Sequence, residues 1–343
     1  MAWKRSSVRI RYAPPKLYII RTTMKFGYIL VTGAAGFIGS HLTDQLINSG
    51  ICEKVIAVDN LSMGTWDNLS TLGSDKLIRV EANIANSEEL SRIFDMYDVD
   101  IVCHLATSPL VLSITDPVFV FENIVTMQKN ILECQRNGKF KKLITFSTSE
   151  VYGSSDGVVL SETSLLKPQT PYASAKAAAD MLTESYAKTF TDKIEYTIVR
   201  PFNNYGPRKR VLSGAGIIPQ AIKAFAAHEP LKLVDNGETM RDFVFVEDTA
   251  RAVIEIIKKP ELTKNELFVI ATGVPRKMKD ISIDIAKLMH RPINIEYVPS
   301  RPGDVSYLKG NGRKIHSKLG FSPDTEWLEG LKACIEYYTR LLP

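Results

Sequence analysis

The sequence predicts an α/β protein, a doubly wound parallel sheet followed by a smaller C-terminal α/β lobe that caps one edge of the sheet. Three observations support this. From Lys25 to about Arg200, short apolar segments alternate with longer helical stretches, as in a parallel sheet covered on both faces. A glycine-rich turn follows the first apolar segment. After Pro201 the alternation ends, and residues 201–216 are rich in Pro, Gly and basic residues.

The individual elements follow from the apolar pattern and its interruptions. We expect strands at Tyr28–Thr32, Val55–Asp59, Leu77–Glu81, Ile101–Leu105, Lys141–Ser147 and Glu195–Arg200. Helices are expected between most of them, at Ile38–Ser49, Ser87–Tyr97, Val118–Asn137 and Tyr172–Phe190. Beyond Pro201 we expect a helix and then strands at Leu231–Val234, Phe243–Val246 and Leu267–Ile270, the last returning to the main sheet.

Length and charge limit the classes of protein to consider. At 343 residues, with 45% hydrophobic and 24% charged residues, the chain has the composition of a globular protein of about two domains. Six Lys or Arg and no acid lie in residues 1–23, so subtracting six from the net charge of +5 leaves −1 for the remainder. A nearly neutral body argues against a nucleic-acid partner.

The basic leader, residues 1–23, is treated apart from the two domains, 24–200 and 201–343. Its longest apolar stretch is Leu17–Ile20, too short for a secretory signal. It could be a disordered basic arm or a targeting peptide. The segment WKRSSVRIRYAPP also resembles the product of reading a transfer-RNA gene in frame, and on that interpretation Met24 is the true start.

Cysteine and apolar patterns bear on location. The four cysteines are widely separated (Cys52, Cys103, Cys134, Cys334). This spacing indicates neither a metal site nor a disulfide framework, so we expect no metal and a cytoplasmic location. Because the sequence has no run of 18 apolar residues, it predicts no membrane span.

The turn after the first strand predicts a dinucleotide site. Residues 28–39 read YILVTGAAGFIG, which places Gly33, Gly36 and Gly39 between a strand and a helix. Such glycines let the backbone approach a pyrophosphate, and the helix N-terminus supplies N–H donors. Asp59 ends the next strand, twenty residues beyond Gly39, where a carboxylate binds an adenosine ribose and repels a 2′-phosphate. NAD is therefore expected rather than NADP.

A Tyr-x-x-x-Lys motif occurs three times, at Tyr12/Lys16, Tyr172/Lys176 and Tyr205/Lys209. Proline interrupts the first and third, whereas TPYASAKAAAD starts with Pro in a first-turn position and continues with alanines. Only the second copy therefore predicts a helix, which places its Tyr and Lys on one face.

This pair predicts hydride chemistry. The Lys176 ammonium and a positively charged nicotinamide are expected to lower the pKa of Tyr172, so that its phenolate can take a proton from a sugar hydroxyl. Thr148, at the end of the preceding strand, is expected to hydrogen-bond the same oxygen.

These motifs resemble the extended short-chain dehydrogenase/reductases that modify nucleotide sugars. The shared elements include TGAAGFIG (32–39), DNLS (59–62), HLA (104–106), STSEVYG (147–153), YASAK (172–176), RPFNNYGPR (200–208), RDFVFVED (241–248) and RPGD (301–304). The resemblance implies a Rossmann domain, bound NAD, a nucleoside-diphosphate sugar under the C-terminal lobe and transient oxidation at the sugar C4. The cofactor residues it implies are Gly33, Gly36, Phe37, Ile38, Gly39, Asp59, Asn60, Asn83, Ile84, Leu105, Ala106, Tyr172 and Lys176.

The resemblance also implies substrate contacts and, through helices 118–137 and 172–190, a homodimer. The substrate residues are Thr107, Ser149, Asn203, Arg208, Arg241, Arg301 and Asp304, with Arg241 and Arg301 on the diphosphate. Two features depart from the usual pattern. Asn83 replaces an Asp that holds the adenine in many relatives, and the loop TSPLVLSITDP lacks the usual second alanine.

Glu150 bears on the choice among reactions. A carboxylate beside a C4 ketone can remove the C5 proton, and loss of water from C6 then leads to a 4-keto-6-deoxy sugar. Dehydratases of the family have Glu at this place. The intervening Ser149 is similar to the pattern of GDP-mannose dehydratases and UDP-glucuronate decarboxylases, while the RPGD loop favours epimerases. The hypothesis is a 4,6-dehydratase, with a UDP-glucose-type 4-epimerase, a decarboxylase and a non-catalytic NAD-sensing protein as alternatives.

Overall fold

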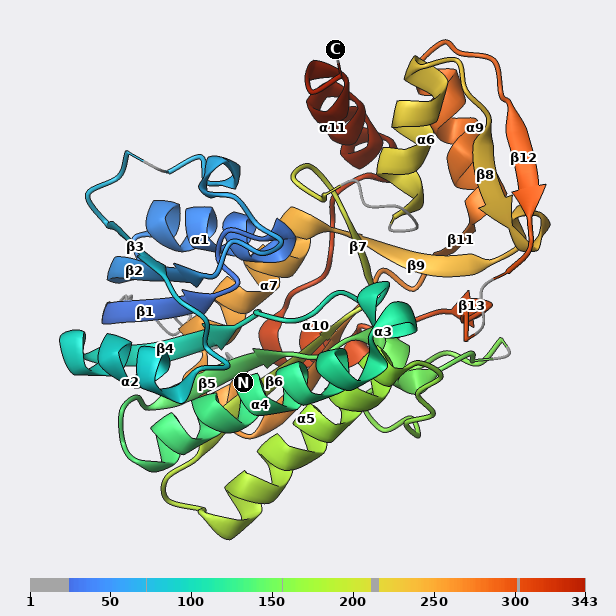
Figure 1. Cartoon of the computed structure of the whole chain (residues 1–343). Helices are drawn as coiled ribbons and strands as arrows, with labels where there is room; N and C mark the ends of the chain where they lie inside the picture. The colour runs from blue at the N-terminus through green and yellow to red at the C-terminus, as the bar shows by residue number, and fades with distance from the viewer. Residues whose placement is uncertain (1–24, 72, 156, 211–215, 301–302, 343) are drawn as a thin grey trace, which may run out of the picture.

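A computed structural model describes residues 25–71, 73–155, 157–210, 216–300 and 303–342. The leader 1–23, the expected start at Met24 and the expected diphosphate ligand Arg301 lie outside the described residues. Figure 1 shows a larger half built around a sheet and a smaller lobe above one edge of it.

The larger half contains a seven-stranded sheet of order β10-β6-β5-β4-β1-β2-β3, with every neighbouring pair parallel. Its strands are β1 (Phe26–Thr32), β2 (Cys52–Asp59), β3 (Leu77–Glu81), β4 (Val99–His104), β5 (Lys142–Phe146), β6 (Glu195–Pro201) and β10 (Glu266–Ile270). The central strands are buried on both faces, which explains why they read as continuous apolar runs. The predicted doubly wound α/β fold is thereby confirmed.

Helices cover both faces of this sheet. One face packs against α1 (Phe37–Ser49), α7 (Val246–Lys258) and α10 (Arg313–Leu319). The other packs against α2 (Ser87–Met96), α4 (Pro117–Arg136) and α5 (Pro171–Thr189). Figure 1 shows α4 and α5 side by side along the outside of the second face. The short helices α3 (Leu112–Thr115) and α8 (Pro260–Thr263) lie in connections.

Local sequence explains where these helices begin and end. Asn86 and Thr170 cap α2 and α5 by accepting hydrogen bonds from first-turn backbone N–H groups. Pro171 takes the first position of α5. At the other end of α1, Gly50 adopts the left-handed conformation, with φ of 66°.

The smaller lobe has its own core between three helices and short strands. Its helices are α6 (Ile217–Ala226), α9 (Met278–Leu288) and α11 (Trp327–Arg340). β9 (Met240–Phe245) pairs with β7 (Asn203–Tyr205), β11 (Pro275–Lys277) and β13 (Tyr307–Leu308), while β8 (Leu231–Val234) pairs with β12 (Ile295–Val298). Short 3-10 turns at Trp66–Asn68 (η1), Ser149–Tyr152 (η2) and Asp235–Gly237 (η3) complete the described elements.

Residues 201–343, expected to form one lobe apart from the returning strand 267–270, are divided between the two halves. α7 packs beside α1, β10 pairs with β6, and α10 packs on β10. The strand expected at Phe243–Val246 ends at Phe245, and Val246 starts α7. Burial explains this path, because the apolar stripe of α7 completes the same core as α1.

Among the helices within the described ranges, none combines the length and the apolar composition needed to cross a membrane.

Candidate active site

The glycine turn between β1 and α1 is a tightly packed piece of backbone. Gly33 has a φ of 68°, and a Cβ there would lie 2.8 Å from the backbone nitrogen of Ala106. At Gly39 a Cβ would lie 2.0 Å from the carbonyl oxygen of Gly33. Only glycine fits these two positions. The segment after β4 lies against Gly33, and α1 lies against the turn at Gly39, so neither position has room for a side chain.

The first turn of α1 is suited to an anion. Its N-cap is Gly36, which makes no side-chain cap hydrogen bond, and its first turn contains no acidic residue. Backbone N–H groups at a helix N-terminus attract a phosphate when no side chain competes for them.

Asp59 holds the turn and faces the same cavity. Its Oδ2 accepts from the Ala35 N–H at 3.0 Å, and its Oδ1 accepts from the Leu61 N–H at 2.8 Å. Burial raises the pKa of Asp59, and these backbone hydrogen bonds act against that rise. Each carboxylate oxygen keeps a lone pair for the hydroxyls of a ribose.

Two residues of this region were missed by the sequence analysis. Asn68 Nδ2 donates to the carbonyl oxygen of Ala35 at 2.8 Å, and a Cβ on Gly64 would lie 2.5 Å from Ala35 backbone atoms. The signal available for them was the Gly and Asn that follow the DNLS segment at close spacing.

One cavity of about 590 Å³ collects all the expected cofactor residues. It runs along the carboxyl ends of the strands. Its lining includes Gly33, Gly36, Phe37, Ile38, Gly39, Asp59, Asn60, Asn83, Ile84, Leu105, Ala106, Tyr172 and Lys176. The cavity size, the glycine turn, the helix N-terminus without a side-chain cap and the Asp59 carboxylate together fit a dinucleotide such as NAD.

A buried hydrogen-bond group joins β1 to β4 beneath this cavity. The Thr32 hydroxyl accepts from the N–H groups of Leu105 and Ala106, both at 3.2 Å, and lies 2.8 Å from His104 Nδ1. With both lone pairs used, the hydroxyl must donate to Nδ1, so the imidazole carries its proton on Nε2. Burial lowers the pKa of His104 to about 3. The ring is therefore neutral and structural.

The expected catalytic residues come together where β5 ends and α5 begins. Thr148 caps the η2 turn by accepting from the Glu150 N–H at 3.3 Å. Tyr172 and Lys176 lie one turn apart on α5, and the Lys176 Nζ donates to the carbonyl oxygen of Phe146 at 2.9 Å. Phe146 itself lines the cavity, so this arrangement places the ammonium at the cavity floor.

The protonation of Tyr172 differs from the expectation. Burial raises its pKa to about 12, a hydrogen bond with Thr148 acts to lower it, and the Glu150 charge raises it further. Desolvation of the phenol is the largest cause, so without cofactor the shift runs opposite to the lowering expected from Lys176 and a nicotinamide together. The positive charge of a bound nicotinamide would have to supply the rest of the lowering.

The expected substrate residues are more scattered. Thr107 is exposed and lines the cavity, whereas Ser149 is buried in η2. Among the described residues, the buried Oδ1 of Asn203 has no hydrogen-bond partner, which suits a donor from a ligand. Arg208 instead donates to Asp44 Oδ2 on α1 at 2.7 Å. A contact between Arg208 and a substrate would require this pair to open.

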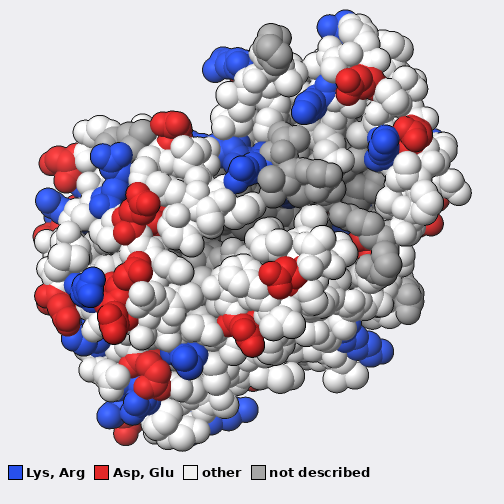
Figure 2. Space-filling model, viewed as in Figure 1, with Lys and Arg blue, Asp and Glu red and all other residues white. Residues whose placement is uncertain are grey.

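In the lobe, Arg241 is buried and its guanidinium donates to the carbonyl oxygens of Met240 and Val305. Asp304, adjacent to Val305, is half-buried. The two expected substrate residues therefore lie on neighbouring segments of the lobe. Figure 2 shows charges of both signs scattered over this face, with Lys and Arg side chains beside the hollow between the halves.

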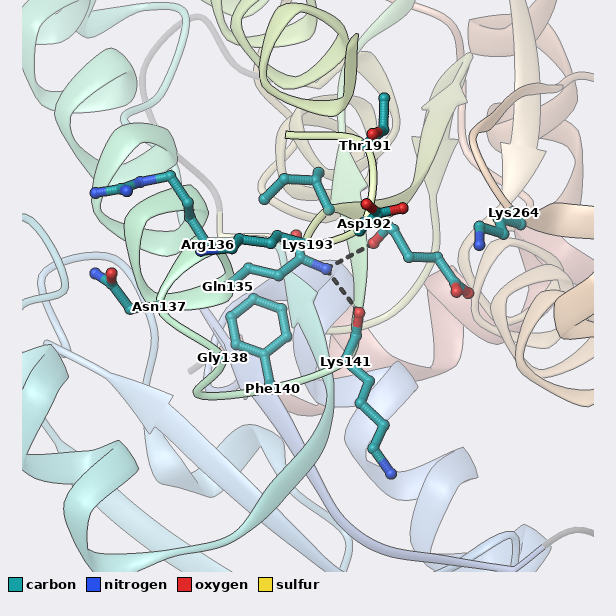
Figure 3. A pocket seen from close by; sticks show the side chains of 12 residues that line it. Gln135, Arg136, Asn137, Gly138, Phe140, Lys141, Thr191, Asp192, Lys193 and Lys264 are labelled. Atoms are coloured by element: carbon teal, nitrogen blue, oxygen red, sulfur yellow. Dashed lines mark hydrogen bonds between the residues drawn. The ribbon is translucent and has the colours of Figure 1, made fainter. Parts of the chain in front are cut away.

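A second hollow, of about 760 Å³, lies where α4 ends and β6 begins, at the opposite edge of the sheet from the glycine turn. Gln135 crosses it, donating to the carbonyl oxygens of Lys141 and Glu195, both at 2.8 Å (Figure 3). The charged ends of Arg136 and Lys141 point away from each other, and Arg136 pairs with Glu133. The groups of this hollow do not converge as those of the cofactor cavity do.

Comparisons with known proteins agree with this geometry. The sequence profile of the NAD dependent epimerase/dehydratase family matches residues 29–271. A UDP-glucose 4-epimerase of Mycolicibacterium smegmatis is 30% identical over 312 residues, covering 90% of this chain and 97% of the relative. Trifunctional UDP-glucose 4,6-dehydratases of Arabidopsis thaliana are 31% identical, and the chain spans about half their length, 47% and 48%.

Solved structures of both activities superpose on the chain. A UDP-glucose 4-epimerase of Thermotoga maritima with UDP-glucose gives a TM-score of 0.85 at 32% identity, covering 92% of this chain and all of the other. A dTDP-glucose 4,6-dehydratase of Streptomyces venezuelae with NAD bound gives 0.85 at 27% identity, covering 91% and 97%. The match over most of the chain, together with the dinucleotide cavity, establishes that this protein belongs to the NAD-dependent epimerase/dehydratase family.

Proposed function

We propose that the protein oxidises C4 of a nucleoside-diphosphate sugar with NAD and acts as a 4,6-dehydratase. Bound NAD would accept the C4 hydride and later return it to the sugar. Tyr172 would take the C4 hydroxyl proton, Thr148 would orient that hydroxyl, and the Lys176 ammonium would stabilise the phenolate. Asn203 and Arg241, with Arg301 and Asp304, would bind the rest of the substrate.

The position of Glu150 is the observation that carries the dehydratase assignment. It shares the η2 turn with Thr148, and its charge is close enough to Tyr172 to raise the pKa of that phenol. A carboxylate this close to the C4 proton acceptor can reach the neighbouring C5 proton. Glu150 would remove that proton and pass it to the C6 hydroxyl, which would leave as water. Hydride would then return from the cofactor to C6, C5 would take a proton from solvent, and Tyr172 would release the proton it took from the C4 hydroxyl.

The 4-epimerase is the second candidate, and it has support of its own. The epimerases of M. smegmatis and T. maritima are as similar to this chain as the dehydratases are. An epimerase needs only Tyr172, Thr148 and Lys176, because the ketone turns over in the site and takes hydride on its other face. In that reaction Glu150 would have no chemical step.

A panel of UDP-, GDP-, CDP- and dTDP-sugars tests the proposal. The purified protein is incubated with each sugar, and the product mass is measured. Loss of water identifies a dehydratase, an unchanged mass with a new stereoisomer an epimerase, and loss of carbon dioxide a decarboxylase. If no sugar is converted and none changes the fluorescence of bound NADH, the enzymatic proposal fails.

We also infer a homodimer in the cytoplasm. α4 and α5 lie side by side, and large apolar side chains of these two helices are exposed (Val118, Phe121, Met181). A second copy would bury these side chains in a four-helix contact. The cysteines among the described residues are free thiols, as a reducing compartment leaves them. Sedimentation at two protein concentrations tests the dimer.

A further inference from the structure

A second group of charges lies behind the Tyr172–Lys176 pair. Asp180 follows Lys176 by one turn of α5, just as Lys176 follows Tyr172. Arg200 comes from β6, and Ser147 follows the end of β5. All three are buried, with exposed fractions of 4% for Asp180, 2% for Arg200 and 6% for Ser147. None of them has a step in the proposed chemistry.

Hydrogen bonds fix the Asp180 carboxylate from two sides. Its Oδ2 accepts from the Ser147 hydroxyl and from the Arg200 guanidinium, each at 2.6 Å. Arg200 also donates to the hydroxyl of Tyr152 at 2.8 Å and lies over its ring. The carboxylate is therefore held by a residue of β6 and by the residue that follows β5.

The buried ion pair of Asp180 and Arg200 is expected to add little to the free energy of unfolding. A buried ion pair repays little more than the cost of desolvating its charges, and apolar side chains of similar volume would serve the core as well. A carboxylate held this rigidly beside the reacting pair calls for another explanation.

The Lys176 ammonium provides a reason for a carboxylate at position 180. It is 5% exposed and donates to the backbone carbonyl of Phe146, so it has lost most of its hydration. Burial lowers the pKa of Lys176 to about 8, and the Asp180 carboxylate acts in the opposite direction. The other ionisable groups facing it are Tyr172 on its own helix and His104 on β4, which is neutral. Arg200 on β6 acts through Asp180.

We propose that Asp180 is a positioning residue that keeps the Lys176 ammonium charged and in place, while Ser147 and Arg200 hold the carboxylate. The inference rests on the proposed function, since it concerns the pair that would start C4 oxidation. It adds a residue that never touches the sugar to the set on which the reaction depends.

The test compares the pH dependence of NADH binding in the wild-type protein and in Asp180→Asn, followed by NADH fluorescence. Lys176 lines the cofactor cavity, so loss of its proton weakens binding of the anionic dinucleotide on the alkaline side. In Asp180→Asn the alkaline midpoint should move to lower pH by about one unit, because a nearby opposite charge of this kind shifts a pKa by at least that much. At pH 6 the two proteins should bind NADH alike.

Tyr152→Phe is the matched control. It removes another hydrogen-bond partner of the Arg200 guanidinium and so damages the same buried cluster without removing the Asp180 charge. Its melting temperature should fall, but its alkaline midpoint should stay that of the wild type. Asp180→Glu, which restores the charge, should move the midpoint back. An unmoved midpoint in Asp180→Asn, or an equal shift in Tyr152→Phe, would overturn the proposal.

A double variant covers the case in which Asp180→Asn does not fold. Asp180→Asn with Arg200→Met removes both buried charges and leaves no unpaired guanidinium. The midpoint should again move to lower pH, by less than in Asp180→Asn, because the Arg200 cation is lost as well. NADH binding needs no sugar turnover. If the sugar panel fails while the midpoint still moves, the proposed function is wrong and the assignment of Asp180 stands.

Discussion

Glu150 is the residue whose role separates the candidate reactions. It lies in the η2 turn, where the Thr148 side chain caps its N–H and its charge acts on the Tyr172 phenol. No backbone requirement of the turn calls for a carboxylate at this position, since any residue could donate the same N–H. The backbone geometry of the turn is therefore compatible with the proposed chemical role of Glu150.

For the dehydratase we expect Glu150→Gln to stop exchange of the C5 hydrogen with solvent while the C4 oxidation continues. The amide keeps the size of the side chain but cannot accept a proton at neutral pH. General-base removal costs about 100-fold or more in the step it serves. Deuterium incorporation measured by mass, together with NADH absorbance, separates the two steps.

Tyr172→Phe provides the comparison, because it should abolish both signals. Tyr186→Phe, on the same helix but bonded to Glu133, should leave both unchanged. Full turnover in Glu150→Gln would exclude the dehydratase and leave the epimerase.

Residue-level prediction worked best where a local rule could select among copies of a motif. Helix propensity and proline placement chose Tyr172/Lys176 from three similar pairs, and the chosen pair lines the cofactor cavity. The lowered pKa of Tyr172 expected with a bound nicotinamide stays a prediction, while burial of the phenol in the protein alone raises its pKa. Burial depends on atoms from several segments, and the sequence pattern does not report it.

At the scale of elements, the β1–α1 unit combines a fold requirement with a binding requirement. The backbone of the turn approaches the helix at Gly39 so closely that no side chain fits. The same closeness directs the N–H groups of α1 toward the cavity. A change that disturbs the contact between Gly39 and Gly33 should therefore lower both the free energy of unfolding and the affinity for the dinucleotide.

Gly39→Ala tests this coupling. A Cβ placed 2.0 Å from the Gly33 carbonyl oxygen must push α1 away from the turn, at a cost of about 1–3 kcal/mol in unfolding free energy. NADH affinity, measured by fluorescence titration, should fall with it.

Gly50→Ala is the control at the other end of the same helix. Gly50 has a φ of 66° with no atoms near its Cβ position, so the change should cost about 1–2 kcal/mol through backbone strain alone. NADH affinity should not change. Equal losses of affinity in the two variants would show that general destabilisation, rather than the turn, weakens binding.

The helix α7 shows why some elements were missed. RDFVFVED reads as a strand ending at Val246, because the apolar alternation continues to that residue. The chain turns into a helix there since the stripe from Ala250 to Ile257 has a buried surface beside α1 to cover. That surface belongs to a segment two hundred residues earlier, beyond the reach of a local pattern.

For the whole molecule, buried neutral histidines set a limit on acid stability. Burial lowers the pKa of His41 to about 4 and that of His104 to about 3, both from an ordinary value of 6.5. The unfolded chain therefore binds protons that the folded protein excludes as the pH falls below 6.5. The stability they contribute is complete above that pH and declines toward the folded values.

We expect the unfolding free energy to fall between pH 6.5 and pH 5 by at most about 2 kcal/mol for each of these two histidines. Urea unfolding at a series of pH values measures the slope. His41 lies at the junction of the halves, where its Nε2 donates to the Pro207 carbonyl oxygen at 3.2 Å. In His41→Asn the slope should be smaller, and an unchanged slope would show that other groups cause the acid loss.

The junction between the halves depends on further contacts of this kind. Asp44 on α1 binds Arg208 and the segment at Ser70 and Thr71. Burial acts to raise the pKa of Asp44, but the hydrogen bonds from Thr71, Ser70 and Arg208 outweigh it and hold the pKa low. The arginine expected on a substrate therefore joins the lobe to the cofactor helix.

The sequence by itself determined the features that follow from neighbouring residues. These are the alternation of strands and helices, the glycine turn at residues 33–39, the carboxylate at Asp59 and the helix that carries Tyr172 and Lys176. Each depends on backbone geometry or side-chain periodicity within a short segment.

Only the tertiary structure decided which distant residues meet. It placed Arg200 and Ser147 on Asp180, paired Arg208 with Asp44, returned α7 to the sheet half and buried Tyr172. The physical reason is that desolvation and ion pairing depend on atoms brought together from separate strands and helices, and these contacts follow from how the whole chain packs.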